Sequence, residues 1–577
     1  MPESHPAIIL MVGALVVALL RGTPQKVVLV ALPIISFINL LHFAPDTNWI
    51  AVVPGLASLH WLRVDSLALV FGYLFHLAAL VAVIYSLHHN DRTQHVTGLL
   101  YAASAIGLVF AGDLITVFIF WELLAITSVF QVWANKDNPR ARGAGLRYLL
   151  MHVSSGLLML AGAALHWRAG FGLEFTSMVD PATHAPVSAG AWLILIAIGI
   201  KCGFPLLHNW LIDAYPESTP SGTLFLCCFT TKAAVYALAR GFEGTEALIL
   251  IGTIMTAFPI FYAVIENDLR RVLSYSMINQ IGFMVVGVGV GGALGVNGAV
   301  AHAFNDVFFK GLLFMSMGAV MLRTGTCKGT DLGCMYKSMP WTTGLCLVGA
   351  ASISAVPLFS GFISKALIVQ AVIDYAANVP AYAWVWIVLM FASAGVVEHA
   401  GIKIPFFGFF GHDSGRRVKE APLNMRVAMA IAAAVCIFNG CYPTFLYSLL
   451  PYTMDYWPYD VAHVIGQFQL LCFASLAVFV LMYTKIYPPE VRSVNLDSDI
   501  VTRKAIPLVW RSAFLPFFGL LKSLRDRAAG VPRWCWLEIN SRTGIGGLLQ
   551  SWQVSGTVVV IALILLVFLL LDFARAL

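Results

Sequence analysis

The sequence predicts an all-α, polytopic membrane protein. Of its 577 residues, 59% are hydrophobic and 11% are charged, whereas about 25% of residues are charged in soluble domains. The mean hydropathy of +0.83 is correspondingly high. Apolar stretches of about 17–25 residues, the length that crosses a bilayer as a helix, recur along the whole chain. Lipid offers no hydrogen-bond partners to the backbone, so each stretch is expected to be helical.

We expect about 14–16 transmembrane helices. The stretches that fit lie at residues 7–21, 26–44, 65–88, 96–111, 113–134, 146–168, 187–208, 221–240, 245–265, 271–291, 296–322, 341–375, 381–410, 424–445, 466–486 and 554–575. The first of them is short, with no basic segment before it and no cleavage site after it. It is therefore predicted to be retained as a helix.

Basic residues are concentrated in alternate loops. The basic loops contain Arg21 and Lys26; Lys136, Arg140 and Arg142; Arg270 and Arg271; Arg323, Lys328 and Lys337; Arg416, Arg417 and Lys419; and the residues of 485–552. The opposite loops hold little more than Arg63, Arg168 and Arg240. The positive-inside rule predicts that the basic loops are cytoplasmic and that both termini lie outside, in a multi-pass protein of the cell's inner (plasma) membrane. It also accounts for the net charge of +6 without a nucleic-acid partner.

Two of the predicted spans are interrupted in a similar way. Pro205 follows Lys201 in one span, and Pro357 precedes Lys365 in the other. Helix breakers at corresponding places in two halves of a chain are typical of inverted repeats, whose broken helices line a hydrated cavity. We therefore predict two inverted five-helix repeats with broken helices. Proline kinks that serve only packing are the alternative.

The predicted organisation has six parts. They are N-terminal helices (1–95), a first repeat (96–240), a second repeat (241–410), C-terminal helices (411–486), a basic segment with several tryptophans (487–552) and a final transmembrane helix (553–577). The basic segment alternates basic and apolar groups. It is expected to lie as amphipathic structure in the cytoplasmic membrane interface.

Ionisable side chains fall at membrane depth. At 1.5 Å per residue, Glu122 lies about 13 Å into a span that begins near Asp113, close to the bilayer centre. A charge there costs about 2.5–3.5 kcal/mol, and such residues are functional by default. The same count places three lysines near the middles of their spans, with histidines interspersed along the chain: Lys201, Lys232, Lys310, His152, His208 and His302.

Together these residues favour a protein that moves protons. A buried lysine gives up its proton more readily than an exposed one, and a nearby carboxylate opposes the loss. Moving or protonating that carboxylate would therefore release the lysine's proton. For any single residue, the alternative is a static ion pair that joins two helices.

Other patterns point away from enzymatic sites. Ten cysteines are scattered through apolar stretches without a C-x-x-C pair, which favours buried thiols over a metal site or disulfides. The glycines between 287 and 292 follow no strand and do not predict a phosphate loop. We expect no metal, no cofactor and no redox centre. Glu398, His399 and Lys403 are interpreted as a solvated helix end.

Four motifs, at residues 113–124, 201–214, 266–282 and 308–314, resemble in this order the proton-conducting antiporter-like family. That family comprises the three large membrane subunits of respiratory complex I and the A and D subunits of Mrp-type Na⁺/H⁺ antiporters. The resemblance covers roughly residues 65–375 and is strongest to proteins like the Mrp D subunit. The segment after residue 487 looks more like the distal complex I subunit.

The resemblance implies roles for individual residues. It makes Glu122 and Lys201 the central pair, Lys232 the connecting lysine, and Lys365 the terminal charged residue at the exit. It extends the proton path through further side chains, namely His208, His302, Asp306 and Lys310. Many members have a histidine four residues before Lys310, where this chain has Asp306. A carboxylate has a lower intrinsic pKa than a histidine, so this position could favour Na⁺.

The function that the resemblance implies is a proton-translocating subunit of a multisubunit monovalent cation/proton antiporter of Mrp type. The alternative is an antiporter-like proton-pumping subunit of a complex I-related NADH:quinone oxidoreductase or of a membrane hydrogenase. A third reading is an ion-motive subunit of an inorganic-carbon uptake complex. In each case other chains supply the distinguishing chemistry. The expected partners are other membrane subunits, the lipid bilayer, protons and Na⁺.

Overall fold

The computed structural model describes residues 4–53 and 57–488, together with positions 490, 491, 495, 497, 508, 511, 512, 516 and 519. The chain divides into two compact units, and the larger one, Met1–Val53 with Ala57–Asn495, holds every helix and strand described below. The amphipathic segment predicted at 487–552 lies almost wholly outside the described residues. The final helix predicted at 553–577 lies entirely outside them.

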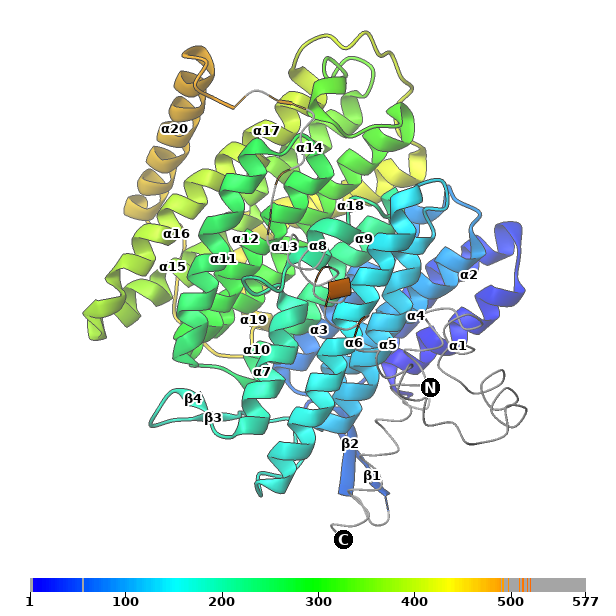
Figure 1. Ribbon diagram of the computed structural model, residues 1–577, viewed down its shortest axis with the longest axis vertical. Coiled ribbons are helices and arrows are strands. Elements are labelled where there is room, and N and C mark those ends of the chain that lie inside the picture. The colour runs from blue at the N-terminus through cyan, green and yellow to red at the C-terminus, as the bar shows by residue number, and fades with distance from the viewer. Residues whose placement is uncertain are drawn as a thin grey trace. The chain divides into compact units, whose positions relative to one another are not determined.

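The larger unit is a bundle of helices (Figure 1). Its α-helices are α1 (Pro6–Leu19), α2 (Gly22–Leu40), α3 (Ser66–Ser86), α4 (Arg92–Phe110), α5 (Leu114–Trp133), α6 (Pro139–Arg168), α7 (Ala189–Cys202), α8 (Asn209–Ala214), α9 (Pro220–Cys228), α10 (Thr230–Gly241), α11 (Glu246–Ile265), α12 (Leu269–Val290), α13 (Gly292–Thr324), α14 (Pro340–Ile353), α15 (Ser360–Asn378), α16 (Ala383–Val396), α17 (Lys403–Pro405), α18 (Leu423–Cys441), α19 (Pro443–Leu449) and α20 (Val461–Tyr483). Two π-helical stretches, Val397–Ile402 and Phe406–Phe410, flank α17. Short 3₁₀ helices lie at Gly329–Asp331 and Pro380–Tyr382.

Strands are confined to two small hairpins in the described residues. The strands β1 (Asn48–Val53) and β2 (Ala57–Arg63) pair antiparallel between α2 and α3. The strands β3 (Val179–Asp180) and β4 (Ala185–Pro186) pair between α6 and α7. Both hairpins connect successive helices and leave the helical core intact.

The helices of the described residues agree with the predicted polytopic membrane fold. In the described part of the chain, 11 helices are long and apolar enough to cross a membrane, and three shorter apolar helices are Pro6–Leu19, Ala189–Cys202 and Pro340–Ile353. The last two of these shorter helices, α7 and α14, are those that end at the predicted breaks. The protein is therefore a multi-pass membrane protein, as predicted.

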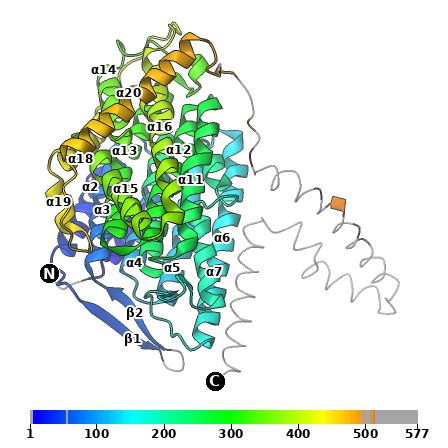
Figure 2. The same cartoon turned by 90° about the vertical axis from the view of Figure 1, so that its left-hand side faces the viewer.

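The most deeply buried helices of the bundle are α9, α10 and α12. The apolar windows of Pro220–Gly241 and Leu269–Val290 are 100% buried, whereas that of Val461–Tyr483 is 6% buried. Helix α20 accordingly runs along the outside of the bundle (Figure 2). Helices α11 and α12 approach closely because Gly252 and Gly282 face each other: a Cβ on Gly252 would lie 2.8 Å from the Gly282 carbonyl oxygen. Small residues at such crossings are typical of membrane bundles.

Both predicted helix breaks are present and share one backbone path. After α7, Gly203 and Leu206 have φ of 76° and 71°, and after α14, Ala355 and Leu358 have φ of 57° and 74°. In both breaks an amide bonds five residues back, Phe204 to Gly199 and Val356 to Ala351. A positive φ at a non-glycine residue is costly. Its recurrence at matching places shows that the same backbone conformation occurs at both breaks.

A third interruption was not predicted. The stretch 221–240 was expected to be one span, but it divides into α9 and α10 at Phe229, which has φ of −108° and ψ of −62°. Neither a proline nor a glycine stands at this position. The break turns the first residues of α10, including Lys232, relative to α9.

Candidate functional site

A row of ionisable side chains lies buried in the middle of the bundle. They come from α6, α7, α10, α13 and α15, and their exposed fractions are 4% or less: His152, Lys201, Lys232, His302, Asp306, Lys310 and Lys365. Lys201, Lys232 and Lys310 were predicted from membrane depth, and the two histidines were noted as interspersed with them along the chain. Asp306 and Lys365 came from the family resemblance. Glu122, on α5, is partly buried.

Lys201, in the last turn of α7, is held by the backbone of α5. Its Nζ donates to the Trp121 carbonyl oxygen at 2.6 Å and lies 4.3 Å from the centroid of the Trp121 ring. The Trp121 indole in turn donates to Ser155 Oγ at 2.9 Å. The lysine is thereby bound to the residue that precedes Glu122.

The Glu122 carboxylate lies against α6. A Cβ on Gly156 would overlap Glu122 Oε1, so only glycine leaves room for the carboxylate in this position. Within the part of the chain that the structure describes, Glu122 Oε1 has no hydrogen-bond partner. The charges of Glu122 and Lys201 act on each other. Among the described residues, however, no direct ion pair joins them.

Lys232 and Asp306 form an ion pair in the fully buried centre of the bundle. Lys232 Nζ lies 2.6 Å from Asp306 Oδ2, and neither side chain is exposed. Lys232 also donates to the Cys227 carbonyl oxygen at 3.2 Å. The pair connects α10 of the first repeat to α13 of the second.

Three site residues follow one face of α13. His302, Asp306 and Lys310 are spaced four residues apart, which places them one above another on a helix. Lys310 Nζ donates to Ser276 Oγ of α12 at 2.6 Å. His302 contacts α12 through Gln280 at 3.1 Å and α15 through the Ser364 hydroxyl at 2.9 Å.

Lys365 lies at the second helix break. Its Nζ donates at 2.8 Å to the carbonyl oxygen of Ile353, the last residue of α14. The partial negative charge at a helix C-terminus favours a cation in this position. The Phe283 ring lies 5.2 Å from the same nitrogen.

The histidines of the first repeat lie between aromatic rings. The His208 ring is 4.8 Å from that of Phe258 on α11. The His152 ring is 4.1 Å from Tyr148 and 4.4 Å from Trp210. Their role in proton transfer remains a prediction.

Sequence reasoning missed the importance of Arg270. It was used only to assign orientation, but its side chain is 1% exposed. It donates to the carbonyl oxygens of Tyr215, Pro216 and Ser218, in the connection between α8 and α9. Arg270 thus ties the start of α12 to the broken helix of the first repeat.

The interpretation of Glu398, His399 and Lys403 as a solvated helix end is wrong. His399 is 0% exposed and Lys403 is 2% exposed. Lys403 donates to backbone carbonyls at the end of α11, at Ala263, Val264 and Glu266. These partners lie more than 130 residues earlier in the chain, so no local sequence pattern could reveal them. Among the described residues, no group of three or more His, Cys, Asp or Glu side chains is arranged to hold a metal ion.

The chain is similar to a known family of membrane subunits. The family model described as "NADH:quinone oxidoreductase/Mrp antiporter, TM" matches residues 111–393. Hydrogenase-4 component B of Escherichia coli (strain K12) is 26% identical over 414 residues, which are 65% of this chain and 61% of that protein. The D subunit of the Na⁺/H⁺ antiporter of Alkalihalophilus pseudofirmus is 26% identical over 363 residues, which are 59% of this chain and 72% of that protein.

Solved structures share the fold. A chain of the Mrp complex from Dietzia sp. DQ12-45-1b matches with a TM-score of 0.73 and 22% identity, covering 99% of this chain and 62% of the other. The chain spans 42% to 61% of the length of the first curated relatives that it matches.

Proposed function

Since the chain belongs to the family of antiporter-like membrane subunits shared by NADH:quinone oxidoreductases and Mrp antiporters, we propose that it translocates protons across the plasma membrane. In this proposal it is one membrane subunit of a multisubunit monovalent cation/proton antiporter of Mrp type, where it takes the place of the D subunit. Its partners are the other membrane subunits of that complex.

The observation that carries the proposal is the way three buried lysines are bound. Among the described residues, Lys201, Lys310 and Lys365 donate hydrogen bonds to neutral acceptors, which are two backbone carbonyls and one hydroxyl. If the lysine of a static ion pair gave up its proton, its carboxylate partner would remain charged and buried without a counter-charge, which is costly. A lysine on a neutral acceptor leaves no such charge behind. These lysines are therefore suited to titrate.

We assign the steps in chain order. Glu122 stabilises the charged form of Lys201 from a distance, and a change at Glu122 releases the proton of Lys201. The Lys232–Asp306 pair links the first repeat to the second. Lys310 and His302 continue the path along α13. Lys365, at the second break, is the terminal residue that releases the proton towards the exit.

Support for an Mrp-type assembly comes from the extent of the match. The chain covers 72% of the length of the antiporter D subunit from Alkalihalophilus pseudofirmus. A carboxylate at Asp306, in the middle of the path, provides a ligand that suits a hard monovalent cation such as Na⁺.

A redox-driven complex is the second candidate, favoured by the similarity to hydrogenase-4 component B. In that case the same lysines pump protons, and the pumping is powered by electron transfer in other chains of the complex. The two candidates differ in what energises the movement of protons.

Everted membrane vesicles that contain the full chain with its companion subunits distinguish the candidates. A pre-formed pH gradient is followed with a pH-sensitive dye while Na⁺, K⁺ or choline is added. An antiporter dissipates the gradient with Na⁺ or K⁺ and leaves it intact with choline. A redox pump acidifies the vesicles when NADH or hydrogen is supplied and does not respond to the cations. Vesicles that lack the chain are the control, and a match between them and the complete vesicles in both assays contradicts proton translocation.

A further inference from the structure

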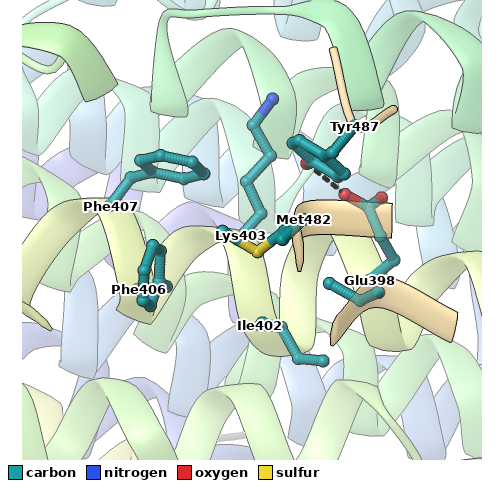
Figure 3. A pocket seen from close by; sticks show the side chains of 8 residues that line it. Glu398, Ile402, Lys403, Phe406, Phe407, Met482 and Tyr487 are labelled. Carbon is teal, nitrogen blue, oxygen red and sulfur yellow. Dashed lines mark hydrogen bonds between the residues drawn. The ribbon is translucent and has the colours of Figure 1, made fainter. Parts of the chain in front are cut away.

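A small cavity with a mostly apolar lining lies in the predicted second repeat, on the side of the bundle that carries Arg270 and Arg271. Its wall is formed by the π-helical stretches, α17, α20 and the segment that follows α20. Figure 3 shows Glu398 and Tyr487 together on one side of the cavity, Phe406 and Phe407 on the other, and Lys403 and Met482 between them.

Lys403 is a fixed charge in this wall. Its Nζ donates to the carbonyl oxygens of Val264 at 2.6 Å and Glu266 at 2.8 Å, at the C-terminal end of α11. It also lies 2.8 Å from Glu490 Oε1. Burial raises the pKa of Glu490, and the Lys403 ammonium opposes the rise. With its donors engaged in this way, Lys403 is poorly suited to carry protons.

Glu398 is the carboxylate with an open oxygen. Its Oε1 accepts a hydrogen bond from the Tyr487 hydroxyl at 2.5 Å (Figure 3). Burial and the neighbouring Glu398 raise the pKa of Tyr487, so that hydroxyl stays protonated and keeps donating. Glu398 Oε2 is buried without a hydrogen-bond partner among the described residues. This oxygen is free to accept a proton.

His399 stands next in the chain and is fully buried. Neither of its ring nitrogens makes a well-aligned hydrogen bond with a described residue, although the Gly395 carbonyl lies close by. Lys310, Lys365 and Lys403 are all within electrostatic range of it. His399 therefore feels the charges of two lysines of the proposed path and of Lys403 in the cavity wall.

The π-helical stretch that contains His399 packs against the second helix break through Gly401. Gly401 leaves room for the Ser354 hydroxyl, which lies directly after Ile353, the residue that binds Lys365. Ser354 Oγ is buried without a partner among the described residues. Single π-helical turns inside α-helices are frequent at functional sites. Here the π-helical stretch contains the acid Glu398 and the imidazole of His399, and its Gly401 lies against the Ser354 hydroxyl.

We propose that this cavity is a proton uptake site, from which Glu398 and His399 carry protons to Lys310 and Lys365. Water in the cavity gives a proton to the Glu398 carboxylate and leaves hydroxide, which the bulk solvent neutralises. The carboxyl passes its proton to one nitrogen of His399, and the other nitrogen releases a proton to an unprotonated lysine. The inference rests on proton translocation by this chain, and it adds an intake that serves the second repeat directly.

Transport in everted vesicles tests this uptake site with three variants of the full complex. Glu398→Gln keeps the shape but cannot titrate, and we expect transport to fall by about 100-fold, the lower end of the range for a lost acid–base group. Glu398→Asp keeps the carboxyl and should retain intermediate activity. Asp413→Asn removes an exposed carboxylate on the same side, 2.8 Å from Arg417, and should transport like the wild type.

A second readout does not depend on transport. Dicyclohexylcarbodiimide reacts with protonated carboxyls in apolar surroundings, and peptide mass spectrometry locates the adduct. We expect an adduct on Glu398 in the wild type that decreases as the pH is raised. The uptake site would be overturned if Glu398→Gln transported as well as the wild type, or if no adduct formed on Glu398 at any pH. Either result would leave the proposed function standing. Absence of transport by the wild type, with a Glu398 adduct present, would instead overturn the proposed function.

Discussion

Lys232 Nζ on α10 lies 2.6 Å from Asp306 Oδ2 on α13, and both side chains are fully buried. The two helices belong to different predicted repeats, so in that organisation this ion pair is a polar connection between the two repeats. Taking both charges out of water is costly, and their attraction offsets that cost only while both are present. The pair is therefore a point at which stability and transport can be separated by experiment.

Removing one partner of this pair should destabilise the protein. Lys232→Met or Asp306→Asn leaves a single buried charge, which costs about 3–5 kcal/mol, and thermal unfolding in detergent should report it. The double variant removes both charges and should regain most of the lost stability. We expect the single variants to lose transport as well. The double variant should not regain it, because neither titratable group of the pair is left between α10 and α13. A double variant that transports normally would show that the pair is only structural.

A further prediction concerns the cation that Asp306 favours. A carboxylate in place of a histidine can take part in binding Na⁺, whereas a histidine offers a neutral nitrogen that suits other ions. We expect Asp306→His to lower the response of the pH gradient to Na⁺ more than the response to K⁺, with choline inactive in both proteins. Vesicles should contain equal amounts of the two proteins. Identical cation profiles would reject a role for Asp306 in selectivity.

Gly156 is expected to control the position of Glu122. A Cβ at this site would overlap the Glu122 carboxylate, so Gly156→Ala should displace it while leaving a helix-favouring residue on α6. Misplacing a reacting group by 1 Å can cost about 100-fold in rate, and we expect a loss between about tenfold and that value. The matched control on the same helix is Gly143→Ala, where a Cβ meets only the flexible Arg147 side chain, at 3.3 Å. Equal transport by the two variants would contradict the prediction.

Much of this arrangement could be predicted from the sequence because it depends on local periodicity. The spacing of His302, Asp306 and Lys310 requires one helix face, and all three residues are 0% exposed. The prolines at 205 and 357 predicted two breaks, and the structure has both, with the same pattern of positive φ. Membrane depth could be counted because the rise per residue of a helix is constant.

The rest depends on contacts that no local pattern encodes. Depth places Lys201 level with Glu122, but it does not tell which way the side chain turns, and the Nζ binds the Trp121 carbonyl. The end of a predicted span indicated solvent around Lys403, but the carbonyls of α11 and the residue Glu490 cover it. The break at Phe229 could not be predicted, because neither a proline nor a glycine stands at that position.

The last prediction concerns coupling between Glu122 and Lys201. The structure separates them by the Trp121 carbonyl, so their coupling is a charge effect without a direct bond. Lys201→Ala should abolish transport while the protein still inserts and assembles. Glu122→Gln removes the charge that favours protonated Lys201, and Glu122→Asp keeps that charge at a shorter reach.

Transport should therefore decrease in the order wild type, Glu122→Asp, Glu122→Gln, measured as initial rates of dye response at equal protein. Two groups that titrate as one unit share their protonation steps, so losses at the two sites should not add. The double variant Glu122→Gln/Lys201→Ala should transport no worse than Lys201→Ala alone. Because Lys201→Ala is expected to reach the background, the additivity test is made with Lys201→Arg, whose residual rate can still fall. If Glu122→Gln lowers that residual rate by the same factor as it lowers the wild-type rate, the two residues act independently, and Glu122 does not control the proton of Lys201.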